Sequence, residues 1–230
     1  MHRVVLWDID HTLIENNGVS KEIYAAAFTA LADKEPQYKA RTEGRTDRLI
    51  MRDLFLDHQL EPPPWDCIEQ ALTAAGAARL DRLRDRGTAL PGVTAALRAF
   101  AARGDTIQSI LTGNILANAK VKLRAFDLDP YVNWDVGAYG ADADDRTDLV
   151  DIARQRITRA HPEAGNALRL VLIGDTPRDV RAAVDGGAGI IAVATGVDSA
   201  AELAAAGASH IFADLSDTAS LMAAFSQLTA

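Results

Sequence analysis

The amino-acid sequence predicts an α/β fold, in which a parallel β-sheet is covered by helices on both faces and carries an inserted helical segment. Short β-rich runs recur along the chain, each ending in a polar or glycine-containing loop, and longer stretches with helical spacing lie between them. Uninterrupted apolar strands that alternate with helices are typical of a parallel sheet buried on both faces. Such a sheet binds ligands at the carboxyl ends of its strands.

Four segments carry the predicted strands. Each is rich in β-branched or aliphatic residues and is bounded by a turn signal. The segments are VVLW (4–7), TIQSILT (106–112), LRLVLI (168–173) and GIIAV (189–193). The loops that follow them are therefore the places to search for functional side chains.

Residues 14–88 do not show the alternation of strands and helices, because helical patterns follow one another there without a convincing buried strand. Ser20 is the predicted N-cap of a helix over SKEIYAAAFTALADK, and a second helix, TDRLIMRDLFLDHQL, follows a turn at Glu43 and Gly44. The proline run EPPPW separates it from an alanine-rich third helix. We therefore divide the chain into an α/β core, residues 1–13 and 89–230, and a helical insertion, residues 14–88.

Composition and charge limit the classes of partner. Hydrophobic residues make up 48% of the chain and charged residues 24%, as in ordinary soluble proteins. The net charge of -8 provides no overall attraction for nucleic acid or for an anionic membrane. Neither a signal-peptide core nor a bilayer-spanning run is present in the sequence, and Cys67 is the only cysteine, so we expect a cytoplasmic protein.

Two carboxylates, Asp8 and Asp10, follow the first predicted strand one residue apart. Two like charges this close resist ionising together unless a cation neutralises them. A hard divalent ion such as Mg²⁺ takes oxygen ligands and is commonly shared between carboxylates and a substrate phosphate. An isolated Asp-x-Asp is more often a solvated acidic loop, so the metal interpretation depends on the other loops.

The loop GDTPRD, residues 174–179, offers two more acids after another apolar strand. Asp175 is placed to reach the same metal as Asp8, because the carboxyl ends of parallel strands meet at one edge of the sheet. Asp179 falls near the start of the next predicted helix, where capping is its alternative role. Pro177 suits an early helical position.

The loop LTGN combines groups that can bind phosphate oxygens. Thr112 offers a hydroxyl, Gly113 a close approach of the backbone, and Asn114 an amide at a helix start. An ordinary strand-to-helix turn with Asn114 as N-cap is the alternative. Lys120 or Lys122 on the following helix could balance phosphate charge, although most helical lysines are simply solvated.

Taken in order, these motifs resemble those of the haloacid dehalogenase-like hydrolase superfamily. The order is strand–Asp-x-Asp-x-Thr, strand–Thr-Gly-Asn, Lys, and strand–Gly-Asp-x3-Asp, and it spans residues 8–179. The insertion directly after the first motif resembles the subgroup with a small helical cap, to which phosphoglycolate phosphatases and β-phosphoglucomutases belong. The resemblance implies a Rossmann-like core and a helical cap over residues 14–88.

By this resemblance Asp8 is the nucleophile that forms an aspartyl-phosphate, and Asp10 is the general acid and then the base that activates water. Mg²⁺ is held by the Asp8 carboxylate, the Asp10 backbone carbonyl and Asp175. Asp179 orients its loop and binds the lysine or a metal-bound water. These assignments form the expected catalytic and metal set.

The same resemblance assigns the groups that bind the substrate phosphate. Thr112, the backbone of Gly113 and Asn114, and a lysine gather the charge of the transferring oxygens. Family members commonly show Lys-Leu-x-x-Phe-x-Leu after this helix start, and KLRAFDL matches, which selects Lys122.

The cap contributes the residues expected to choose the substrate. EGRTDR resembles the turn that caps in this subgroup lower onto the active site, so Arg45 is expected to contact the substrate, with an ordinary helix-connecting turn as an equal alternative. Hinges are expected near residues 14–18 and 86–91. His11 departs from the glycine often found in this loop, and we interpret it as a passive surface residue.

The predicted function is that of a Mg²⁺-dependent phosphatase of small phosphorylated metabolites. An acid at Asp10 points to phosphate esters, because haloacid dehalogenases and phosphonatases usually lack an acid at this position. A phosphomutase of sugar phosphates that uses the same aspartyl-phosphate chemistry is one alternative. A catalytically idle binding module of the same fold is the other.

Overall fold

The computed structural model describes residues 3–230, with only the backbone of residues 164 and 166. Its centre is a five-stranded parallel sheet in the order β4-β1-β5-β6-β7. The strands are β1 (Arg3–Trp7), β4 (Thr106–Ile110), β5 (Arg169–Gly174), β6 (Gly189–Val193) and β7 (His210–Phe212). The predicted parallel α/β sheet is confirmed. The sequence did not predict β7, a three-residue edge strand.

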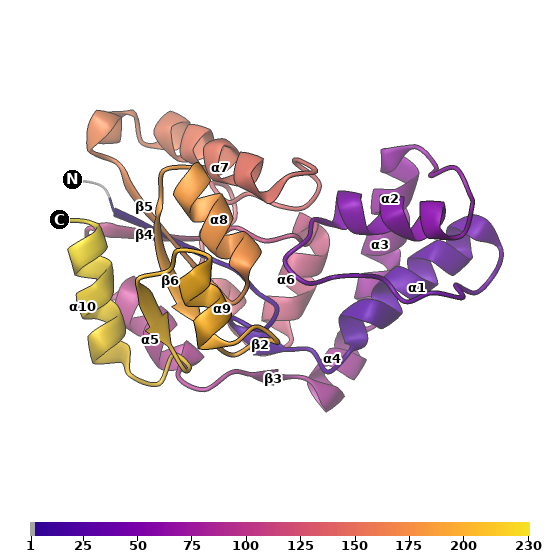
Figure 1. The fold of residues 1–230 in the computed structure, drawn as a ribbon, viewed down its shortest axis with the longest axis horizontal. Helices are drawn as coiled ribbons and strands as arrows, with labels where there is room; N and C mark the ends of the chain where they lie inside the picture. Colours follow the sequence, from indigo (N-terminus) through magenta and orange to yellow (C-terminus); the bar gives the residue numbers. More distant parts are fainter. Residues whose placement is uncertain (1–2) are drawn as a thin grey trace.

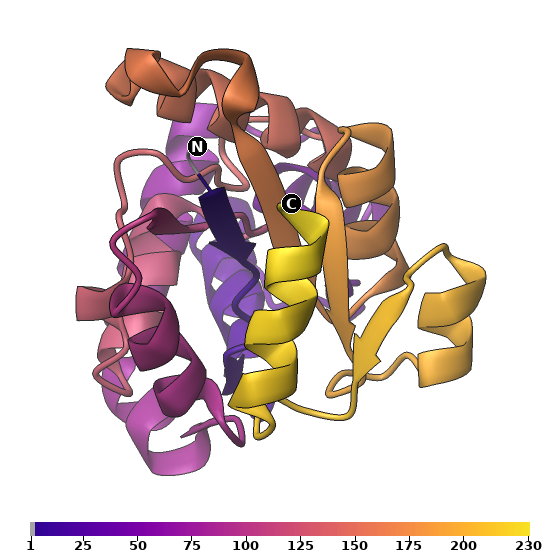
Figure 2. The same ribbon diagram turned by 90° about the vertical axis from the view of Figure 1, so that its left-hand side faces the viewer.

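Helices cover both faces of the sheet (Figures 1 and 2). Val5 and Trp7 of β1 belong to one hydrophobic cluster and Val4 and Leu6 to the other, since alternate side chains of a strand point to opposite faces. The first cluster includes α5 (Val93–Ala101), α6 (Leu116–Arg124) and α10 (Thr218–Leu228). The second includes α7 (Arg146–Ala160), α8 (Pro177–Asp185) and α9 (Ala200–Ala205). Two short 3₁₀ helices occupy Asp129–Tyr131 and Pro162–Ala167.

Four further helices lie together beyond the carboxyl end of β1, on the right of Figure 1. They are α1 (Val19–Ala32), α2 (Asp47–Asp57), α3 (Trp65–Ala77) and α4 (Leu80–Arg86). A separate hydrophobic cluster, which includes Phe28, Met51 and Phe55, holds α1, α2 and α3 together, and α4 contacts α1. Short antiparallel strands β2 (Ile14–Glu15) and β3 (Thr88–Ala89) connect this group to the sheet. We propose that residues 14–88 act as a cap with its hinges at β2 and β3.

Helix α1 begins differently from the prediction. Gly18 is its N-cap and adopts a left-handed conformation with φ of 83°. The Asn16 side chain accepts hydrogen bonds from the backbone N–H groups of Gly18 and Ser20 at 3.0 and 3.2 Å, so the first turn is capped from outside the helix. The prediction of Ser20 as N-cap was therefore wrong. Its hydroxyl instead donates to Asp10 at 3.3 Å.

None of the helices found within residues 3–230 has the length and apolar character required to cross a bilayer.

Candidate active site

Three buried carboxylates gather where β1 and β5 end. One oxygen each of Asp8, Asp175 and Asp179 lies within 4.8 Å of the others, and all three residues are at most 5% exposed. Asp8 follows β1 and Asp175 follows β5, and these strands are neighbours in the sheet. The predicted closeness of Asp8 and Asp175 is thus observed, and the loop after β5 adds Asp179.

A buried arginine, Arg146, lies inside this carboxylate cluster. It is the first residue of α7, and its Nη2 lies 3.0 Å from Asp8 Oδ1 and 2.6 Å from Asp179 Oδ1. Arg146 was not predicted as a site residue, because an arginine after the acidic loop DADD resembles a solvated residue. Its position was nevertheless a signal, since a cation at a helix N-terminus opposes the helix dipole and needs a compensating partner.

Asp179 also caps helix α8. It accepts hydrogen bonds from the Thr176 backbone N–H at 3.0 Å and from the Thr176 hydroxyl at 2.7 Å, and its own N–H donates to that hydroxyl at 3.2 Å. The alternative capping role is therefore confirmed, with Pro177 in the first turn as predicted. Arg146, rather than the expected lysine, is the cation that pairs with Asp179, and Lys122 pairs with Asp10 instead.

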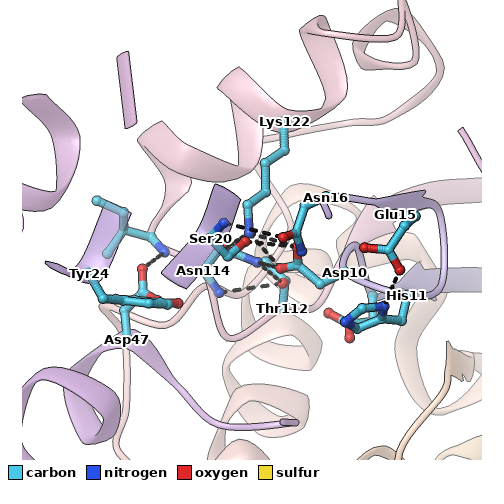
Figure 3. A network of polar contacts seen from close by, with 12 residues as sticks. Asp10, His11, Glu15, Asn16, Ser20, Tyr24, Asp47, Thr112, Asn114 and Lys122 are labelled. Carbon is cyan, nitrogen blue, oxygen red and sulfur yellow. Dashed lines mark hydrogen bonds and ion pairs between the residues drawn. The ribbon is translucent and has the colours of Figure 1, made fainter. Parts of the chain in front are cut away.

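Asp10 points toward helix α6 and Lys122 (Figure 3). Lys122 Nζ lies 2.8 and 2.6 Å from the two Asp10 carboxylate oxygens and 2.6 Å from Asn114 Oδ1. Asn114 Nδ2 donates to Asp10 at 2.8 Å and to the Thr112 hydroxyl at 2.8 Å. The structure thus brings together four of the predicted site residues.

Lys122 differs from an ordinary helical lysine, because it is only 1% exposed. Lys120, by contrast, lies with its ammonium group 5.7 Å from the centre of the Trp134 ring. The geometry therefore agrees with the choice of Lys122. Ile115 is the N-cap of α6, so Asn114 does not serve as the cap.

Residues of the helical segment 14–88 also line this site. A cavity of about 50 Å³ has Asp8, Asp10 and Arg146 on its core side, and Tyr24 and Arg45 on its cap side. Ligand pockets for small metabolites usually measure at least about 300 Å³. The cavity in this structure is therefore smaller than a pocket that holds a small metabolite.

Arg45 and His11 both line the cavity and both already have partners. The Arg45 guanidinium pairs with Asp53 of α2, and its contact with a substrate stays a prediction. His11 Nδ1 lies 2.9 Å from a Glu15 carboxylate oxygen, and the passive interpretation of His11 also stays a prediction.

The pKa of Asp10 is shifted in the opposite direction from the pKa values of Asp8 and Asp175. Burial raises the pKa of Asp8 to about 6, against the opposing charge of Arg146. Burial and the charges of Asp179 and Asp8 raise the pKa of Asp175 well above its ordinary value. Burial alone would raise the pKa of Asp10 too, but Lys122 and Asn114 hold it below its ordinary value. Asp10 is therefore ionised at neutral pH. The negative charges of the carboxylate cluster, by contrast, repel one another.

The cluster of Asp8, Asp175 and Asp179 is suited to a divalent cation. The cluster presents only oxygen donors, and a bound cation would relieve the repulsion that raises the pKa of Asp8 and Asp175. The Asp10 side chain is engaged by Lys122, and the contribution of its backbone carbonyl to a metal site stays a prediction. The residues present are thus suited to Mg²⁺.

A fourth buried carboxylate, Asp47, lies outside the cluster at the start of α2. Burial raises its pKa to about 6, against the effect of hydrogen bonds from Tyr24 and the Ile115 N–H. The ordinary value for this group is 3.8, so the folded protein binds the Asp47 proton more tightly than the unfolded chain does. The contribution of Asp47 to the free energy of unfolding is therefore fully present at low pH and is lost as the pH rises through about 6.

We expect Asp47→Asn to remove the loss of stability that Asp47 causes as the pH rises, because the amide does not ionise. Between pH 4 and pH 7, the free energy of unfolding of the variant should rise relative to wild type by as much as about 3 kcal/mol. Urea titrations of both proteins at several pH values measure the difference. A difference that stays constant across this range would contradict the prediction.

Comparisons with known proteins identify a family and a common fold. A family model described as haloacid dehalogenase-like hydrolase matches residues 5–183. CbbY from Rhodobacter sphaeroides, solved in complex with phosphate, shares the fold with a TM-score of 0.69 at 22% identity, over 94% of this chain and 96% of that one. A hydrolase from Pseudomonas syringae has a TM-score of 0.67 at 22% identity, over 97% of this chain and 98% of that one.

A third structure is that of a predicted phosphoglycolate phosphatase from Haemophilus somnus. Its TM-score is 0.66 at 16% identity, over 96% of this chain and 98% of that one. No curated protein matches the sequence. At these identities the solved structures establish a common fold.

Proposed function

The chain belongs to the haloacid dehalogenase-like hydrolase family, and from this premise we propose that it is a Mg²⁺-dependent phosphatase of small phosphorylated metabolites that acts in the cytoplasm. The observation that carries the proposal is that two neighbouring carboxylates have different environments. Asp8 lies in a buried carboxylate cluster, whereas Asp10 is paired with Lys122. CbbY supports the substrate class, since it has been solved with phosphate and, as a mutant, with xylulose-1,5-bisphosphate.

Asp8 is the proposed nucleophile. Its carboxylate lies at the core side of the cavity with Arg146 beside it. A carboxylate oxygen attacks phosphorus, the bond from phosphorus to the leaving oxygen breaks, and an aspartyl-phosphate forms. Water then attacks this intermediate and releases phosphate, which restores Asp8.

Asp10 is the proposed proton carrier for both steps. It is ionised while Lys122 and Asn114 hold its carboxylate. The negative charge of an arriving phosphoryl group raises the pKa of a nearby carboxylate, so Asp10 can take up a proton as the substrate enters. It donates this proton to the leaving oxygen and later accepts one from the attacking water.

Cations and hydrogen-bond donors surround the transferring phosphoryl group in this proposal. Thr112, the backbone of Gly113 and Asn114, and Lys122 bind its oxygens, where most stabilisation is needed in phosphoryl transfer. Arg146 adds a second cation beside Asp8.

Mg²⁺ would be held by Asp8, Asp175 and the Asp10 backbone carbonyl, with Asp179 in the same cluster. When bound, it neutralises the carboxylates so that the nucleophile and the anionic substrate do not repel one another.

Phosphate release from a panel of phosphorylated metabolites tests the function. The panel includes phosphoglycolate, sugar monophosphates, sugar bisphosphates and nucleotides. We expect turnover of at least one ester with Mg²⁺, at least about a 100-fold loss with chelator, and recovery when Mg²⁺ is added back. Transfer of phosphate between sugar hydroxyls without release would indicate a mutase. Absence of both reactions from every ester would favour the idle binding module.

A further inference from the structure

One acidic side chain of the cap reaches the core directly behind the phosphate-binding loop. Asp47, the first residue of α2, accepts a hydrogen bond from the Tyr24 hydroxyl of α1 at 2.6 Å and one from the Ile115 backbone N–H at 2.8 Å (Figure 3). Ile115 directly follows Asn114, which binds Asp10 and Lys122. One carboxylate therefore links two cap helices to the end of the proposed phosphate-binding loop.

The backbone of the cap docks on the same loop. The Asp47 N–H donates to the Gly113 carbonyl oxygen at 2.7 Å. A Cβ atom on Gly113 would collide with the Arg45 carbonyl oxygen, and one on Gly140 would collide with the Gly113 carbonyl group. Only glycine permits this backbone-to-backbone approach. The start of α2 thus lies directly against the loop, with no side chain between them.

The Ile115 N–H depends on this acceptor. Ile115 is the N-cap of α6, so its N–H lies outside the hydrogen-bond ladder of the helix. Ile115 and Asp47 are both fully buried, so water does not take the place of the carboxylate in the docked structure. Without Asp47 this backbone position loses the contact that fixes it, and Asn114 is its immediate neighbour.

We propose that Asp47 is a positioning residue, which holds the Thr112–Asn114 loop in its catalytic geometry only while the cap is docked. Asp47 belongs to the inserted segment and Ile115 to the core, so their hydrogen bond exists only when the two are together. Tyr24 and Asn114 line the cavity, and Asp47 lies behind them. It therefore acts through Ile115 rather than on the substrate, and docking of the cap completes the loop.

Amide hydrogen exchange measured by NMR tests this contact without any assay of activity. The Ile115 amide should exchange at least about tenfold faster in Asp47→Ala than in wild type. In Asp47→Asn it should exchange at close to the wild-type rate, because the side-chain carbonyl oxygen still accepts. The Ala119 amide, which donates to the Ile115 carbonyl oxygen at 3.0 Å, is the internal reference for α6 and should not change.

Equal exchange of the Ile115 amide in Asp47→Ala and wild type would overturn the proposal. Asp47→Ser, whose shorter side chain does not reach the Ile115 N–H, replaces Asp47→Ala if that variant does not fold.

The kinetic consequence rests on the proposed phosphatase function. Asp47→Ala should lower kcat about 10- to 100-fold and change KM by less than about threefold, because the loop binds the phosphoryl oxygens most tightly in the transition state. Asp47→Asn should restore kcat to within about threefold of wild type. A purely structural role would instead lower the folded fraction and leave kcat per folded molecule unchanged.

Asp57→Ala is the matched control for the kinetics. It removes a carboxylate from the other end of α2, where Asp57 pairs with Arg41 at 3.0 Å on the surface, and it should keep wild-type kinetics. An unchanged kcat in Asp47→Ala, or a loss that Asp47→Asn fails to restore, would refute the positioning role. If wild type releases no phosphate from any ester, only the proposed function fails, because hydrogen exchange still decides the role of Asp47.

Discussion

Asp8→Asn should abolish phosphate release while the protein stays folded. The amide keeps the size of the carboxylate but lacks the negative charge that attacks phosphorus, so kcat should fall at least about 10⁴-fold. Arg146 keeps Asp179 as its partner at 2.6 Å. Because burial raises the pKa of Asp8 to about 6, the neutral amide should not lower the free energy of unfolding of the metal-free protein at pH 7.

Phosphate release and thermal unfolding, measured on the same preparation, separate loss of chemistry from loss of fold. Asp105→Asn is the matched control, because Asp105 lies at the opposite edge of the sheet before β4 and pairs on the surface with Arg3 and Arg103. It should keep the kcat of wild type. Turnover by Asp8→Asn above about 1% of wild type would exclude Asp8 as the nucleophile.

Arg146→Met should cause the largest loss of stability at the site. The change leaves Asp8 and Asp179 buried without the cation that pairs with both of them. Removing one partner of a buried ion pair typically costs about 3–5 kcal/mol. The kcat of the folded fraction should fall as well, because a cation beside the nucleophile is lost. Mg²⁺ should recover part of the stability, since it binds the folded state and offsets the same charges.

Urea titrations at pH 7, with chelator and with Mg²⁺, measure both effects. Arg156→Met is the matched control on the same helix, because Arg156 pairs with Asp142 at 2.7 Å but is 34% exposed. Such a partly solvated pair should cost about 1 kcal/mol or less. Equal losses in the two variants would contradict the role of Arg146 as the counterion of the buried cluster.

Burial decided which strands could be predicted. The four predicted strands correspond to β1, β4, β5 and β6, which span five or six residues each, and the apolar runs of β1, β5 and β6 mark strands inside the sheet. β7 spans only three residues at the sheet edge, and all three are partly exposed. β2 and β3 span two residues each, which is too short for any periodic pattern. The positions of these short strands are set by the rest of the fold.

The same distinction applies to the site. Asp8, Thr112 and Asp175 could be placed together from sequence because each follows its own parallel strand. Arg146 and Asp47 could not, since each stands at the start of a helix where its residue type has an ordinary surface role. Their importance comes from tertiary burial against residues far away in the chain. The catalytic roles assigned to all these residues stay predictions.

The place of β1 in the sheet has a consequence for biosynthesis. This strand leaves the ribosome before β4 and β5, yet it lies between them in the sheet. Contacts between such distant segments form slowly, because a long loop must close before they are made. Until then the apolar segment VVLW stays unpaired and exposed to association with other nascent chains. A ribosome that stalls before β5 therefore produces a polypeptide that carries Asp8 but has no Asp175 to accompany it.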